Sequence, residues 1–211
     1  LAAGPGRREC LRRWRTAAAA VSSAVSAECS WGSGPALARA VAQALPRGSR
    51  LVVGSSNAVR DLDLGVDWAA VRGPAEAEPA AGPGDTGPVR VIANRGLAGI
   101  DGVVSTAAGV ALAGGGATYA LVGDLTFLHD VGALLIGPLE RRPDLTVVVV
   151  NDDGGGIFTT LEPGEPERAA DFERIFGTPT GARIAPRRPG TRARCRAWRG
   201  RRRCSPCRPR G

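Results

Sequence analysis

The sequence predicts an α/β fold, a parallel β-sheet flanked by helices, and three observations support this prediction. Short apolar segments alternate along the chain with segments of helical periodicity. Apolar residues make up 43% of the 211 residues, which is enough to fill a core and excludes a disordered chain. The segment 145–150 is apolar throughout, as expected for a strand that helices cover on both faces. Such an alternation is typical of a layered α/β domain.

Each element follows from its local pattern. Short runs rich in valine, isoleucine and leucine predict the strands, which are 50–53, 89–93, 118–122 and 145–150. Helical spacing of apolar or small residues predicts the helices, which are 14–27, 34–45, 105–113 and 131–139. The remaining segments are a loop or short helix at 57–64, a Pro/Gly/Glu loop at 73–88 and a glycine-rich turn at 94–102.

The charge of the chain is unevenly distributed. The formal net charge is +8, but residues 181–211 hold twelve of the 28 basic residues and no acidic residue. Residues 1–180 therefore hold 16 basic and 20 acidic residues, a net charge of −4. We expect three parts: 1–34 as a linker or the remnant of a preceding region, 35–180 as the folded domain, and 181–211 as a tail.

Two interpretations of this Arg/Pro/Cys-rich tail remain open. It lacks the apolar periodicity of a packed element, so we expect it to be disordered. An arginine-rich tail can bind nucleic acid or anionic lipid by counterion release. Alternatively, the tail is the out-of-frame product of a GC-rich gene, the interpretation we favour, which makes a nucleic-acid partner unlikely. The pair Cys204 and Cys207 lacks a second ligand pair and is weak evidence for zinc.

Localisation follows from two absences in the sequence. No apolar run reaches the roughly 18 residues of a transmembrane helix. The first residues also lack the basic and then apolar layout of a signal peptide. We therefore expect a cytoplasmic protein with no membrane partner.

Polar and glycine residues follow the predicted strands, where α/β sheets bind ligands. These strand ends are 54–56, 94–96, 123–124 and 151–156. If the last two strands are neighbours, their ends lie about 5 Å apart. Asp124 and Asp152 can then share one Mg²⁺, which prefers oxygen ligands and often takes phosphate oxygens as well. The glycines at 154–156 would let the backbone approach a phosphate. The alternative is that each aspartate caps a helix.

The spacing of these residues resembles the thiamine-diphosphate motif, in which Gly-Asp is followed after nearly thirty residues by a paired Asn. Here the two parts are GDL at 123–125 and NDDG at 151–154. The strings SSNAVRDLDL, ANRGLAGIDGVVSTAAGVALA, GDLTFLHDVGALLIGP, NDDGGGIFTTLEPGE and DFERIFGTP narrow the match. Over roughly residues 35–180 the chain resembles the 2-succinyl-5-enolpyruvyl-6-hydroxy-3-cyclohexene-1-carboxylate synthases of menaquinone biosynthesis, here called SEPHCHC synthases.

The resemblance implies a thiamine-diphosphate-binding domain of the diphosphate (PP) type, with Mg²⁺ or Mn²⁺ as its metal. The implied metal ligands are Asp124, Asp152 and the carbonyl of Gly154. Because Asp152 replaces the usual Asn, the preceding Asn151 remains an alternative ligand. The other implied cofactor residues are Gly123, Leu125, Ile100, Ile157 and Phe158.

The resemblance also implies a reaction: decarboxylation of 2-oxoglutarate and addition of the succinyl unit to isochorismate. The implied substrate residues are Ser56, Arg60, Arg95, Phe158 and Leu161. Arginine forks suit the carboxylates of both substrates. Arg60 could instead be a surface charge beside Asp61. We expect a structural role for His129, the only histidine.

In that family the cofactor lies between two domains, usually of different subunits, and the other domain supplies an activating Glu. No part of this chain is a candidate for that domain, so we assign no catalytic residue here. We expect a fragment of a homo-oligomeric transferase that is inactive alone. The open alternatives are another thiamine-diphosphate carboligase or decarboxylase, and a non-catalytic Arg-tailed nucleic-acid-binding fragment.

Overall fold

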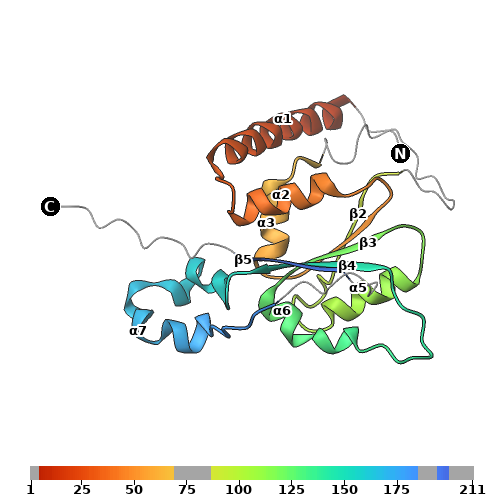
Figure 1. Cartoon of the computed structure of the whole chain (residues 1–211). Helices are drawn as coiled ribbons and strands as arrows, with labels where there is room; N and C mark the ends of the chain where they lie inside the picture. Colours follow the sequence, from red (N-terminus) through yellow and green to blue (C-terminus); the bar gives the residue numbers. More distant parts are fainter. Residues whose placement is uncertain (1–4, 69–86, 185–193, 200–211) are drawn as a thin grey trace.

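The computed structural model of the chain describes residues 5–68, 87–184 and 194–199 (Figure 1), and of the last six it describes the backbone only. Most of the predicted 73–88 loop lies outside these residues, as do Cys204 and Cys207. None of the described helices is both long and apolar enough to cross a membrane.

A five-stranded parallel sheet forms the centre of the fold. Its strands are β1 (Arg50–Val53), β2 (Arg90–Ala93), β3 (Thr118–Gly123), β4 (Leu145–Asn151) and β5 (Arg194–Arg199). They lie in the order β2-β1-β3-β4-β5, and every neighbouring pair is parallel. The predicted α/β class is confirmed, and the four predicted strands lie within a residue of the observed ones.

Strand β5 corrects one prediction about the tail. We expected no packed element within 181–211, yet the backbone of 194–199 pairs with β4, from Thr146 opposite Arg194 to Asn151 opposite Arg199. An edge strand offers unpaired backbone N–H and C=O groups, and pairing with them does not require apolar periodicity. The predicted disorder of 185–193 and 200–211 concerns residues outside the described part of the chain.

Helices cover both faces of the sheet. The α-helices of the described residues are α1 (Pro5–Glu28), α2 (Gly34–Ala44), α3 (Asn57–Gly65), α5 (Val103–Leu112), α6 (Asp124–His129) and α7 (Ala169–Phe172). Helices α2 and α3 lie on one face, α5 and α6 on the other, and α1 lies outside α2 and α3 (Figure 1). The ambiguous segment 57–64 is thus a helix, and its apolar Ala58 and Leu62 are buried at helical spacing.

Two separate cores follow from this arrangement. Leu51, Val53 and Leu121 pack with α2 and α3 on one face. On the other face, Val52, Val122 and Val149 pack with α5 and α6. Strand β4 is fully buried only at alternate residues, because its opposite face is only half covered. The apolar residues of β4 therefore alternate between a fully buried face and a half-covered face of the sheet.

The predicted helix 131–139 is wrong beyond its first turn. Residues Val131–Leu134 form a single 3₁₀ turn, η1, and the chain then runs as a loop to β4. Gly132, Gly137 and Pro138 disfavour a longer helix, and Leu135 and Leu139 are 88% and 96% exposed, so no packing stabilises one.

The segment after β4 consists of short helical turns. These are η2 (Gly156–Thr160), η3 (Glu162–Gly164), η4 (Pro166–Arg168), α7 and the π-helical turn η5 (Glu173–Gly177). Arg168 joins two of them through ion pairs with Glu162 and Glu165, at 2.7 and 2.8 Å.

The strand order positions the site. The chain passes from β1 to β2 on one side and then crosses β1 to reach β3 on the other side. The switch point therefore lies between the carboxyl ends of β1 and β3, which is where sheets of this order bind their ligands. Residues 54–57 and 123–124 follow these two ends.

Candidate functional site

Asp124 is the buried centre of the candidate site. It follows β3 as the first residue of α6 and is only 2% exposed. Its carboxyl group accepts hydrogen bonds from the backbone N–H groups of Leu125 and of Gly154, the latter at 2.9 Å. A buried carboxylate needs such donors, because burial without them is costly. The bond to Gly154 ties the tip of β3 to the turn that follows β4.

Asp152 brings a second carboxyl group to the same place. It follows β4, which pairs with β3 up to Gly123 opposite Val150. Its carboxyl group lies close enough to that of Asp124 for the two to interact electrostatically, and a Cβ atom on Gly156 would collide with its Oδ2. Although the residue as a whole is solvent-exposed, its carboxyl group is thus turned inward. The structure therefore brings Asp124, Asp152 and Gly154 together.

The negative charge of Asp124 opposes the ionisation of Asp152. Burial, and next the negative charge of Asp124, raise the pKa of Asp152 to about 6, and Asp61 adds to this effect. Burial also raises the pKa of Asp124, although its hydrogen bonds act in the opposite direction. A pair of adjacent carboxylates of this kind favours either a shared proton or a cation.

Asn151, the alternative ligand, lies elsewhere. Its Oδ1 accepts a 3.0 Å hydrogen bond from the backbone N–H of Asp153, and its Nδ2 donates to the carbonyl of Ala182 at 3.4 Å. It is 7% exposed. Both ends of its amide are thus used in holding the turn, and the carboxyl group beside Asp124 is that of Asp152.

The glycines after β4 make room for a neighbouring stretch of backbone. Gly154 has a φ of +130°, and a Cβ there would collide with the carbonyl of Gly177. The N–H of Gly155 donates to that same carbonyl at 2.7 Å, and a Cβ on Gly155 would meet the carbonyl of Phe176. Gly154 and Gly155 thus make room for the backbone at 176–177. At Gly156 the close neighbour is the carboxyl group of Asp152.

The tip of β1 is linked to the loop 94–102. The hydroxyl of Ser55 donates to the carbonyl of Gly99 at 2.9 Å. Ser56 has a φ of +66°, which is strained for a residue with a side chain, and its carbonyl accepts a 2.7 Å hydrogen bond from Arg60. Arg60 and Arg95 are both solvent-exposed. No hydrogen bond within the described residues joins either arginine to the aspartate pair.

The other predicted cofactor and substrate residues are buried to differing degrees. Gly123, Leu125, Ile100 and Ile157 are half-buried, whereas Leu161 is 47% exposed. Phe158 is half-buried, and its ring lies 5.5 Å from that of Phe176, which in turn contacts Phe172 at 6.2 Å. These rings hold the 172–177 segment over the turn. His129 is the last residue of α6, and it is exposed.

The donor set at the strand ends fits a hard divalent cation. Two carboxyl groups close enough to interact electrostatically offer the oxygen ligands that Mg²⁺ or Mn²⁺ prefers. Across the described ranges, no group of three or more His, Cys, Asp or Glu side chains could hold a metal. The other ligands of an octahedral ion would therefore be backbone carbonyls, water or the oxygens of a bound molecule.

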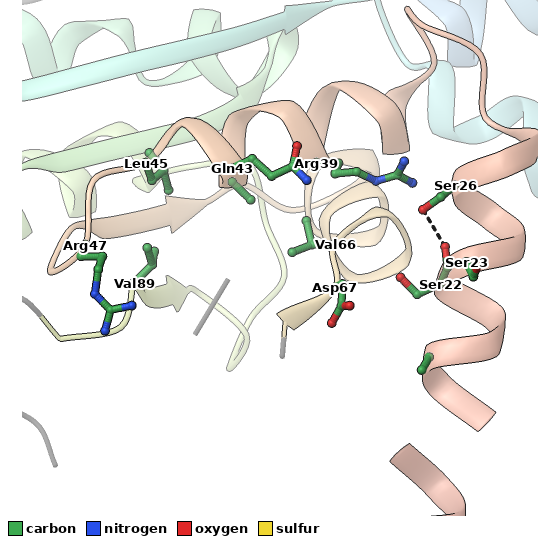
Figure 2. A pocket seen from close by; sticks show the side chains of 12 residues that line it. Ser22, Ser23, Ser26, Arg39, Gln43, Leu45, Arg47, Val66, Asp67 and Val89 are labelled. Atoms are coloured by element: carbon green, nitrogen blue, oxygen red, sulfur yellow. Dashed lines mark hydrogen bonds between the residues drawn. The ribbon is translucent and has the colours of Figure 1, made fainter. Parts of the chain in front are cut away.

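A groove of about 650 Å³ lies away from these strand ends (Figure 2). Its lining comes from α1, α2 and the segments beside β1 and β2, and includes Ser22, Arg39, Gln43, Leu45 and Val89. None of the residues predicted for the site lines it. We therefore place the candidate site at the strand ends rather than in the groove.

Sequence reasoning missed two contributors to the site. Asp61, on α3, acts electrostatically on Asp152, and the segment 176–179 packs against Gly154. The string DFERIFGTP, which covers the latter, was visible in the sequence but had no assigned role. No sequence signal distinguished Asp61 from the nearby Asp63, since both lie in the same short segment 57–64.

Fold and site together define a parallel α/β domain with a paired-carboxylate site at the carboxyl ends of its strands. No model of a protein family matches the chain. The chain is 51% identical over 184 residues to the 2-succinyl-5-enolpyruvyl-6-hydroxy-3-cyclohexene-1-carboxylate synthase of Saccharopolyspora erythraea, which covers 86% of this chain and 30% of that protein. The chain is thus a relative of the SEPHCHC synthases, as its motifs predicted.

Two further relatives carry the same name. The chain is 51% identical over 177 residues to the synthase of a Nocardioides species, covering 80% of this chain and 30% of the relative. It is 54% identical over 150 residues to that of Nocardia farcinica, covering 71% and 24% respectively. The chain therefore spans less than a third of the length of these relatives.

Proposed function

We propose that this chain is the thiamine-diphosphate- and Mg²⁺-binding part of a SEPHCHC synthase, a cytoplasmic transferase of menaquinone biosynthesis. The reaction would be decarboxylation of 2-oxoglutarate with addition of the succinyl unit to isochorismate. The observation that carries the proposal is the convergence of Asp124 and Asp152 in a chain half identical to proteins of that name.

In this proposal the aspartate pair holds the metal. Asp124 and Asp152 would hold Mg²⁺ or Mn²⁺ through carboxylate oxygens, with the carbonyl of Gly154 as a third ligand, and the metal would supply the positive charge that binds the diphosphate. When bound, thiamine diphosphate supplies the nucleophilic carbon and accepts the electrons released with CO₂. The burial of Asp124 and its bond to Gly154 keep the first ligand fixed.

The exposed arginines would bind the substrates. Arg60 and Arg95 follow the ends of β1 and β2, on the edge of the sheet where β3 delivers Asp124. Guanidinium forks bind carboxylates in a bidentate manner, and 2-oxoglutarate and isochorismate each carry carboxylates. Ser56, Phe158 and Leu161 would complete the substrate contacts, and Ile100, Ile157 and Phe158 those of the cofactor.

The chain alone would bind the cofactor but not complete the reaction. We propose that the activating Glu comes from a second domain and that the intact enzyme is a homo-oligomer. Proton transfer to and from the cofactor requires such a group.

Calorimetric titration of the purified chain with thiamine diphosphate in Mg²⁺ tests the first part. We expect saturable binding that EDTA abolishes and that Asp124→Asn weakens; no binding at any Mg²⁺ concentration would contradict the proposal. Product analysis with 2-oxoglutarate and isochorismate tests the second. We expect the succinylated product only when the remaining part of a related synthase is supplied. A product from other 2-oxo acids alone would indicate a different carboligase.

A further inference from the structure

Asp130 makes an unusual connection between two helices. Its Oδ2 accepts a 2.7 Å hydrogen bond from the backbone N–H of Ser105, and its Oδ1 accepts one of 2.9 Å from the hydroxyl of the same serine. Asp130 immediately follows α6, and Ser105 is the third residue of α5. One carboxylate thus makes a two-point contact across 25 residues of sequence.

Helix α5 needs this external cap because its own sequence provides none. The residue before it is Gly102, which has a φ of +66° and no side chain that could accept a hydrogen bond. The first N–H groups of a helix have no partner within the helix. A carboxylate at this position meets one of them and interacts favourably with the helix dipole.

The two connected segments carry different parts of the proposed site. Helix α6 begins with Asp124, the buried carboxyl group that accepts the N–H of Gly154. Helix α5 continues from the loop 94–102, which contains Arg95 and Ile100.

That loop is itself tied to the first turn of α5. The side chain of Asn94 donates to Thr106 Oγ1 at 3.0 Å, and this hydroxyl donates to the carbonyl of Gly102 at 2.7 Å. The first turn of α5 is therefore bonded on one side to the loop and on the other side to Asp130.

We propose that Asp130 is a positioning residue that fixes α6, and with it Asp124, relative to the loop carrying Arg95 and Ile100. This inference rests on the proposed function, because the site it aligns is the proposed cofactor site. Asp130 does not itself contact the aspartate pair in any hydrogen bond of the described residues. Its effect passes through α6, a helix of six residues that begins with Asp124 and ends at His129, directly before Asp130.

The first experiment measures this coupling without any ligand. Backbone hydrogen exchange, followed by mass spectrometry, compares the complete chain with Asp130→Asn, Asp130→Ala and Ser105→Ala. We expect faster exchange in three places at once: the loop 94–102, the first turn of α5 and α6. Strands β3 and β4 should stay as protected as in the unchanged chain. Faster exchange confined to the first turn of α5 would show a local helix cap and overturn the proposal.

The second experiment measures affinity for thiamine diphosphate in Mg²⁺ by calorimetry on the same variants. Loss of a residue that supports metal ligands typically weakens binding by about 10-fold to 100-fold, and we expect the low end for Asp130→Ala. Ser105→Ala, which removes only the hydroxyl bond, should have a smaller effect. The double variant should be no weaker than Asp130→Ala, because both changes remove one contact.

Asp144→Asn is the matched control, since Asp144 is an exposed aspartate at the opposite end of β4. It should change neither exchange nor affinity. Binding within twofold of the unchanged chain in both Asp130 variants would overturn the proposal. If the unchanged chain bound no cofactor, the proposed function would fail while the exchange pattern still decided whether Asp130 couples the two segments.

Discussion

The carboxyl group of Asp124 and the backbone N–H of Gly154 form a 2.9 Å hydrogen bond that joins the tips of two neighbouring strands. The bond is buried and spans 30 residues of sequence. It holds the turn after β4 against β3, and so places Asp152 beside Asp124. The arrangement of the two carboxyl groups therefore follows from sheet pairing and one backbone bond.

Substitutions of Asp124 should separate its structural and binding roles. Asp124→Asn keeps an acceptor for Gly154, so we expect it to fold while Mg²⁺-dependent binding of thiamine diphosphate weakens by at least 10-fold. Asp124→Ala leaves the N–H of Gly154 without its partner and should also lower the free energy of unfolding by about 1–3 kcal/mol. Urea unfolding and calorimetry measure the two effects. Equal losses of stability in both variants would contradict this division.

The raised pKa of Asp152 predicts a pH-dependent stability. In EDTA, the folded chain holds this proton more tightly than the unfolded chain does. The contribution of protonated Asp152 to the free energy of unfolding is therefore complete below pH 3.8 and is lost as the pH rises through about 6. Because Asp152 is solvent-exposed as a residue, we expect a loss of roughly 1 kcal/mol rather than that of the full shift. Urea unfolding between pH 4 and 7.5 measures it.

Two variants and the addition of Mg²⁺ test whether Asp152 is the group responsible for this pH dependence. Asp152→Asn should flatten the dependence, and Asp61→Asn should move its midpoint below pH 6, because Asp61 contributes to the raised pKa. Mg²⁺ competes with the proton, so saturating Mg²⁺ should restore stability above pH 6. An unchanged pH profile in Asp152→Asn would assign the titration to another group.

The sequence was sufficient for the fold and for the central pair, for physical reasons. The carboxyl ends of parallel strands lie at the same edge of a sheet, so polar residues that follow β3 and β4 are expected to lie close together. Asp124 and Asp152 do lie close together. The buried apolar strands were equally clear, since each was short, β-branched and bounded by turn residues.

The rest depended on contacts that sequence does not encode locally. The extended helix at 131–139 failed because no surface packs against Leu135 and Leu139. The approach of the segment 176–179 to Gly154 and Gly155 could not be predicted, because more than twenty residues of sequence separate the two segments. The cap that Asp130 places on α5 is likewise a long-range contact, and helix-capping patterns read only neighbouring residues.

The core beneath the site should be sensitive to truncation. Leu121 is 1% exposed in the central strand β3 and packs with the α2 and α3 face. We expect Leu121→Ala to lower the free energy of unfolding by about 2–5 kcal/mol, through lost burial and the cavity left behind. Leu139→Ala, at a residue that is 96% exposed, is the matched control and should change it by less than about 0.5 kcal/mol. Urea unfolding distinguishes the two.

Alanine substitutions at Gly154 and Gly156 should have opposite consequences, although the two residues lie in one turn. Gly154→Ala places a Cβ against the carbonyl of Gly177 at a φ of +130°, so it should destabilise the fold by more than about 1 kcal/mol. Gly156 has no such φ, and its Cβ would meet the flexible carboxyl group of Asp152. Gly156→Ala should therefore keep the stability of the chain but displace that carboxyl group, weakening Mg²⁺-dependent cofactor binding. Thermal unfolding and calorimetry on both variants test this.

Gly132→Ala is the control for the added methyl group, because a Cβ atom on Gly132 would have open space around it. If Gly156→Ala bound the cofactor with unchanged affinity, Asp152 would not be a ligand.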